Sequence, residues 1–191
     1  MNTTRLEAFS DGVLAIVITI MVLEIKVPHD TEPAALVPLI PVFLSYLLSF
    51  VYIGIYWNNH HHMLHTLQRV SGSVLLANLH LLFWLSLVPF ATGWMGQNHR
   101  AIAPAALYGA VMVMAAVAYF LLQGRIIASQ GPDSLLRRAV GRDWKGHTSL
   151  TLYLVAMLAS LRSPALAQVI YALVALMWLI PDRRIERVLS D

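Results

Sequence analysis

A single aspartate near the start of a long apolar segment is the sharpest chemical feature of this sequence. Asp11 lies in the stretch Arg5-x-x-x-Phe9-Ser10-Asp11-Gly12, which opens the first apolar run. A carboxylate near the bilayer interior is costly and by default indicates a functional site. An acid in the first turn of a helix is also a favourable cap for the helix dipole. Both interpretations of Asp11 stay open at this point.

Four of the eight histidines gather in the segment Trp57-Asn-Asn-His-His-His-Met-Leu-His65. His61 and His65 are four residues apart and share a helix face, which suits a metal site. No acid or cysteine nearby in the sequence completes a ligand set, and haem would need an apolar pocket with defined axial ligands. A metal- or haem-binding protein built on His60, His61 and His65 is therefore an alternative, while the prediction is no metal site and no cofactor.

Polar residues elsewhere in the apolar runs need hydrogen-bond partners if they are buried. These residues are Ser10, Asp11, Asn58, His60, Asn78 and His80. We expect them to form one inter-helix hydrogen-bond cluster.

The composition places these residues in a membrane protein. Of the 191 residues, 58% are hydrophobic and 12% are charged, the mean hydropathy is +0.67, and there is no cysteine. A soluble domain has about twice this share of charged residues. The composition excludes a disordered segment, a disulfide-stapled domain and a cysteine zinc site.

The apolar runs predict an all-α, polytopic fold with six transmembrane helices in one domain covering residues 1–191. A span needs roughly 20 mostly apolar residues, and the runs are too continuous for barrel strands. The expected spans are 6–25, 34–57, 70–95, 101–127, 148–161 and 164–180. The fifth is short because Arg162 ends it.

The basic residues predict the orientation of these spans. With six spans, ten of the 13 lysines and arginines fall on the side of the two termini and three on the other side. The positive-inside rule therefore places both termini in the cytoplasm. This distribution marks membrane sidedness and contact with anionic lipid rather than nucleic-acid binding.

One stripe of residues on the first span points in a different direction from Asp11. At about 100° per residue, Gly12, Ile16, Thr19, Ile20, Leu23 and Val27 share one side. Asp11 points roughly 140° away from Ile16. We expect Asp11 to face neighbouring helices, while the stripe faces lipid, another helix or a pore axis.

Motifs typical of enzymes and of common channels are missing from the sequence. It contains no Walker loop, GxSxG, HExxH or paired-carboxylate segment, and no TVGYG filter or arginine-repeat voltage sensor. We predict that the protein is not an enzyme. An ion- or proton-coupled transporter that uses Asp11 and the histidines is an alternative, although such carriers more often show internal repeats and broken mid-membrane spans.

The segment from Arg5 to Pro28 closely resembles the first span of the endolysosomal-type potassium channel family and its prokaryotic homologues. Trp57-x-x-His60-His61, Asn78-x-His80 and Ser86-Leu-x-Pro89-Phe90 are similar to motifs of the same family. Animal members carry two six-span repeats, and the single repeat here resembles the prokaryotic form.

This resemblance implies a homotetramer in a prokaryotic plasma membrane, with no soluble partner, that conducts cations and favours potassium as the permeant ion. The first spans surround the axis, and Ile16, Thr19, Ile20 and Leu23 match the pore-lining positions. Ile16 would form an apolar constriction that acts as gate and selectivity element. The residues that would support this helix are Arg5, Phe9, Ser10, Asp11, Trp57, His60, Asn78 and His80.

Overall fold

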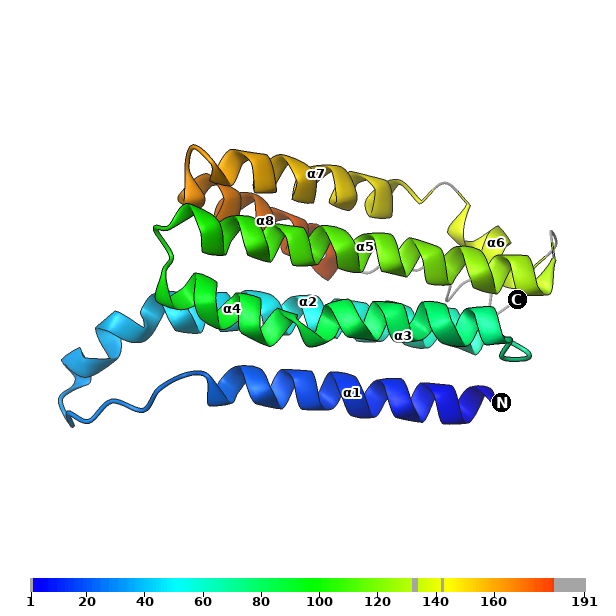
Figure 1. Ribbon diagram of the computed structural model, residues 1–191, viewed down its shortest axis with the longest axis horizontal. Helices are drawn as coiled ribbons and strands as arrows, with labels where there is room; N and C mark the ends of the chain where they lie inside the picture. Colours follow the sequence, from blue (N-terminus) through cyan, green and yellow to red (C-terminus); the bar gives the residue numbers. More distant parts are fainter. Residues whose placement is uncertain (1, 132–133, 142, 181–191) are drawn as a thin grey trace.

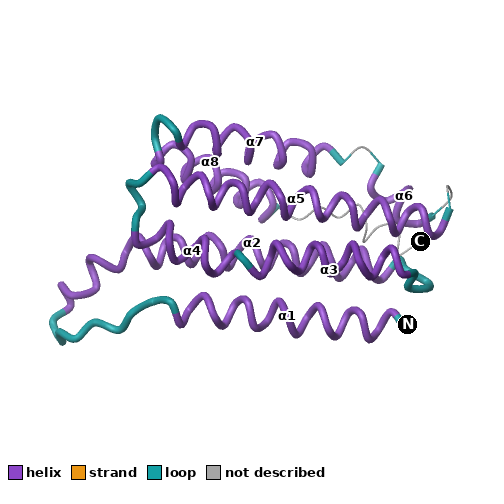
Figure 2. The backbone as a smooth tube through the Cα atoms, in the orientation of Figure 1, coloured by secondary structure: helices purple, strands orange, loops and turns teal. Residues whose placement is uncertain are grey.

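The computed structural model describes residues 2–131, 134–141 and 143–180, and the regular elements of these residues are all helical (Figure 2). They are α1 (Thr3–Leu23), the 3-10 helix η1 (Pro33–Leu39), α2 (Ile40–His65), α3 (Gly72–Ser86), α4 (Val88–Gln97), α5 (Ile102–Gln130), α6 (Leu135–Val140), α7 (Trp144–Ser160) and α8 (Pro164–Leu179). The prediction of an all-α fold is confirmed.

Local signals set several of the helix ends. The side chains of Asn2, Ser71 and Ser163 each accept a hydrogen bond from a backbone N–H in the first turn of α1, α3 and α8. These caps satisfy N–H groups that have no partner inside the helix. Gly131 ends α5 with a φ of 89°, a conformation that glycine adopts without the steric cost of a side chain.

Four helical segments are long and apolar enough to cross a membrane: Thr3–Leu23, Pro33–His65, Gly72–Gln97 and Ile102–Gln130. The fifth and sixth expected spans correspond to α7 and α8, which have 17 and 16 residues. These lengths are short of the roughly 20 residues that a full crossing needs. They pack against each other and against α5. The count of six spans therefore stays a prediction.

The third expected span, 70–95, is interrupted in the structure. Helix α3 ends at Ser86 and α4 begins at Val88, but the two together form one apolar segment, Gly72–Gln97, that is long enough to cross a membrane. Pro89 explains the break, because its nitrogen has no hydrogen to donate to the preceding turn. A similar effect shapes the second span, whose first turns form η1 around Pro38 rather than an α-helix.

The helices are arranged in layers, with α1 on one side of the bundle (Figure 1). The middle layer holds α2 and α3–α4, and α5, α7 and α8 lie on the far side of this layer from α1, with α5 packed against α3 and α4 and α8 against α2. Helix α1 packs against α2, α3 and α4. One side of α1 is therefore supported by the middle layer.

Buried hydroxyl groups tie the middle layer to α5. The Ser49 hydroxyl lies 2.7 Å from the Thr92 hydroxyl and 3.0 Å from the Tyr108 hydroxyl, so α2, α4 and α5 meet at one serine. All three side chains are nearly inaccessible to solvent. The layer against which α1 packs is therefore joined to α5 by buried hydrogen bonds.

Candidate functional site

The face of α1 that points away from the bundle is apolar and uncovered. Ile16 is 59% exposed, Ile20 43% and Leu23 79%. Leu14, on the other side of the same helix, is 2% exposed. Burial therefore divides α1 as the sequence predicts, with the stripe through Ile16 outside the subunit core.

Thr19 is the polar member of this uncovered face. Its hydroxyl donates a hydrogen bond of 2.9 Å to the carbonyl oxygen of Ile16, one turn earlier. This contact satisfies the hydroxyl hydrogen and leaves the oxygen free to act as an acceptor. The side chain can thus present partial negative charge to a cation without unwinding the helix.

A chain of three buried side chains holds the supported face of α1. His60 Nε2 lies 2.7 Å from Asn78 Oδ1, and Asn78 Nδ2 donates to Ser10 Oγ at 3.0 Å. The Ser10 hydroxyl then donates to the Leu6 carbonyl at 2.8 Å. Because the Asn78 oxygen can only accept, Nε2 of His60 carries the hydrogen. One polar chain therefore joins α1, α2 and α3.

A second polar group joins α1 to α2, and it is less buried than the first. The indole nitrogen of Trp57 donates to Asp11 Oδ1 at 3.0 Å, and His61 Nδ1 lies 2.7 Å from Glu7 Oε1. Glu7 and Asp11 are one turn apart on α1, as are Trp57 and His61 on α2. Two acids on one helix thus meet two hydrogen-bond donors on the next.

Glu7 is a member of this group that was not predicted from the sequence. The available signal was its spacing, because Glu7 precedes Asp11 by four residues and therefore shares its side of the helix. The neighbours of His61 in the sequence include no acid, since its partner comes from a different helix.

The single polar cluster expected from the sequence is wrong, because its members lie in separate groups. His80 accepts a hydrogen bond of 2.9 Å from Trp84 on its own helix, and Asn58 is exposed. The structure also does not bring Arg5 and Phe9 to either group. Both are exposed, Phe9 by 53%, and no hydrogen bond or ion pair of the Arg5 side chain is found in the described residues.

The geometry of the histidines gives no support to the metal or haem alternative. Among residues 2–131, 134–141 and 143–180, no three histidine, cysteine, aspartate or glutamate side chains are grouped so that they could hold a metal ion. The His61 ring instead stacks on the rings of Trp57 and His65 and pairs with Glu7.

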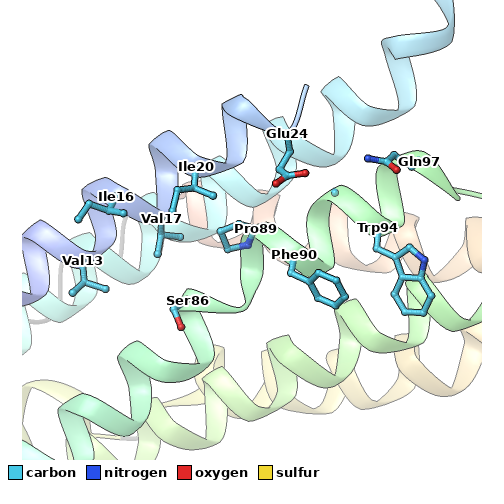
Figure 3. Close-up of a pocket in the computed structure, with 11 residues that line it drawn as sticks. Val13, Ile16, Val17, Ile20, Glu24, Ser86, Pro89, Phe90, Trp94 and Gln97 are labelled. Atoms are coloured by element: carbon cyan, nitrogen blue, oxygen red, sulfur yellow. The ribbon is translucent and has the colours of Figure 1, made fainter. Parts of the chain in front are cut away.

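A groove of about 650 Å³ runs between α1 and α4 (Figure 3). We call it the α1–α4 groove, and its walls are mostly apolar, with Glu24 and Gln97 at one end and Ser86 toward the other. Glu24 rests against the backbone of α4, since a Cβ added at Gly93 would lie 3.6 Å from its carboxylate. The lining residues are Val13, Ile16, Val17, Ile20, Glu24, Ser86, Pro89, Phe90, Gly93, Trp94 and Gln97.

These features define a helical membrane protein whose first helix is fixed by polar contacts on one side and bare on the other. Comparison with known proteins gives the family. The sequence profile described as "Endosomal/lysosomal potassium channel TMEM175" matches residues 5–89. A potassium channel from Chryseobacterium sp. is 52% identical over 191 residues, which is 100% of both chains. The chain belongs to the TMEM175 family.

Two further comparisons extend this result. The crystal structure of a lysosomal potassium-selective channel TMEM175 homolog from Chamaesiphon minutus superposes with a TM-score of 0.84 at 29% identity, covering 94% of this chain and 97% of that one. The human endosomal/lysosomal proton channel TMEM175 is 36% identical over 96 residues, or 44% of this chain and 19% of the human protein. The family consists of ion channels, so the prediction that the protein is not an enzyme is confirmed.

Proposed function

We propose that this chain is the subunit of a homotetrameric, potassium-permeable channel in a bacterial plasma membrane. Four copies of α1 surround the axis, and the permeant potassium ions pass along Ile16, Thr19, Ile20 and Leu23. The observation that carries the proposal is the uncovered apolar stripe on α1. The polar contacts on the opposite side of the helix fix the direction in which this stripe points.

The proposed mechanism follows from the order of side chains along α1. A narrow ring of isoleucine side chains excludes water and blocks ions until it widens. Thr19, one turn from Ile16, would offer hydroxyl oxygens to an ion that has lost part of its hydration shell. Ile16 would thus act as gate and selectivity element, and Thr19 would lower the cost of passing it.

The supports of α1 would keep this stripe pointed at the axis. Ser10, bound through Asn78 to His60, fixes the rotation of the helix from behind, and Asp11, bound to Trp57, fixes it from the flank. Rotation of α1 by one residue would turn Ile16 by about 100° and remove it from the axis. The polar contacts are therefore proposed as positioning elements of the pore.

Both termini are proposed to lie in the cytoplasm. Arg69 follows the second span, Arg125 lies in the last turns of α5, and Arg137 and Arg138 belong to α6, all on the side that the positive-inside rule assigns to the cytoplasm. Four of the ten basic residues on which the prediction depends, Arg142, Arg183, Arg184 and Arg187, lie outside the described residues.

Potassium flux into proteoliposomes tests the proposal, with Ile16→Asn as the main variant. The polar side chain would hydrate the constriction, and a decrease of about 1.4 kcal/mol in the barrier would raise the flux about tenfold. Selectivity for potassium over sodium should fall at the same time. The matched control is Val169→Asn, which places asparagine at an equally exposed apolar position on α8. Absence of flux from both the wild type and Ile16→Asn would refute the channel.

A further inference from the structure

Exposed aromatic side chains are confined almost entirely to one half of the subunit. In α1–α4 the large exposed apolar residues include Phe9, Phe43, Phe50, Trp57, Phe83, Phe90 and Trp94, whereas in α5–α8 they are aliphatic except for Trp144. Aromatic residues are enriched where proteins meet proteins, and aliphatic side chains satisfy lipid. The α1–α4 half therefore has the surface of a protein interface.

This interface has two different flanks, one on each side of α1. The α1–α4 groove, which Glu24 and Gly93 both line, lies on one flank. The bond between Asp11 and Trp57 puts α2 on the other flank, and Figure 1 shows α2 behind α3–α4 with α1 below both. The exposed stripe of α2 on that flank, which we call the α2 ridge, consists of Ile40, Phe43, Leu47 and Phe50.

A closed ring joins two unlike surfaces of each subunit, one on either side of the axis-facing helix. We propose that the α2 ridge of one subunit seats in the α1–α4 groove of the next copy of this chain. The proposal rests on the tetramer proposed above and names the surfaces that close it. The groove is lined by the stacked rings of Phe90 and Trp94, whose centres are 6.2 Å apart, while the ridge carries the exposed rings of Phe43 and Phe50 that would fill it.

The depths of the two surfaces in the membrane match. Ser49 and Thr92 are bonded at 2.7 Å, so the α2 residues around Ser49 and the α4 residues around Thr92 lie at the same level. Phe50 and Phe90 are therefore within about one helical turn of each other in height. Rotation about an axis normal to the membrane leaves height unchanged, so Phe50 of one subunit lies at the level at which the proposed contact with Phe90 of the next requires it.

The natural absence of cysteine makes the test direct. In Phe50→Cys/Phe90→Cys, copper phenanthroline or a short bismaleimide should convert most of the protein in membranes to cross-linked dimers, trimers and tetramers on a denaturing gel. Phe50→Cys and Phe90→Cys alone should stay monomeric on that gel, because a ring contact never places two copies of the same residue together. Phe50→Cys/Leu173→Cys is the matched control, since Leu173 is exposed on α8 and should not cross-link.

Three outcomes would overturn the proposal. Cross-linking of a single-cysteine variant would indicate a two-fold interface, and equal cross-linking of the Leu173 control would indicate random collision. A tetramer in solution whose Phe50/Phe90 pair does not cross-link would indicate that lipid or another surface covers the groove. If that pair does not express, Leu47→Cys/Trp94→Cys tests the same contact one turn away. A full ladder with no potassium flux would refute conduction and leave the interface standing.

Discussion

Replacing Asn78 with leucine should destabilise the subunit by about 2 kcal/mol. The side chain is fully buried, and the substitution removes its bonds to His60 and Ser10. His60 then has no partner at either ring nitrogen, since its buried Nδ1 already lacks one in the described residues. An unsatisfied buried group costs about 1–3 kcal/mol, and inter-helix bonds in membrane proteins average about 0.6 kcal/mol.

The assay is thermal unfolding of the detergent-solubilised protein. For a chain of this size, 2 kcal/mol corresponds to a decrease in Tm of about 4–8 °C. Asn58→Leu is the matched control, because it makes the same chemical change at an exposed asparagine on α2. Its effect should stay within about 0.5 kcal/mol.

The double variant His60→Phe/Asn78→Leu separates bond loss from packing loss. Replacing both partners with apolar groups of similar shape is nearly neutral, so the double variant should be more stable than the sum of the two single effects. Additive losses would refute the reasoning, because they would mean that the two side chains contribute independently and that no buried group is left unsatisfied.

Two more substitutions test the support of α1 and the packing of the outer helices. Asp11→Ala removes the acceptor of the Trp57 indole and should abolish potassium flux or tetramer assembly in proteoliposomes. Normal tetramers with unchanged flux would contradict this expectation. Asp11→Asn, which keeps the acceptor oxygen, is the control. Gly109→Ala should lower the free energy of unfolding by about 1–3 kcal/mol, because its new methyl group would collide with the Tyr171 hydroxyl. Gly124→Ala, with nothing within 4 Å, should be neutral or stabilising, and an equal loss there would rule out overpacking as the cause.

Much of the supported face of α1 could be predicted from the sequence. Buried polar residues in apolar helices have few possible partners, so Ser10, His60 and Asn78 could be grouped by residue type and position alone. Helical periodicity separated the direction of Asp11 from that of Ile16. The grouping depends on the scarcity of polar groups in apolar helices, and it held for these three of the six residues expected in one cluster, while the separation of directions depends on local helix geometry.

A contact of a side chain with the backbone of a distant helix could not be predicted. The fifth span was expected to begin after Lys145, but α7 begins at Trp144 and its lysine is 7% exposed. The Lys145 ammonium donates to the Ile180 carbonyl at 2.9 Å and lies 5.6 Å from the centre of the Trp178 ring. Nothing near Lys145 in the sequence reveals an acceptor that the end of another helix supplies.

The Arg-x-x-x-Phe-Ser-Asp motif of α1 is split over three surfaces, and this division changes what substitutions in it should do. Arg5 and Phe9 are exposed and share the side of Ile16, because the spacings of four and seven residues keep one helix face. Ser10 is buried against Asn78, and Asp11 lies on the flank with Trp57. Loss of Ser10 or Asp11 should therefore disturb a single subunit. Loss of Arg5 or Phe9 should leave the subunit fold intact and act only where the proposed tetramer brings four of these faces together.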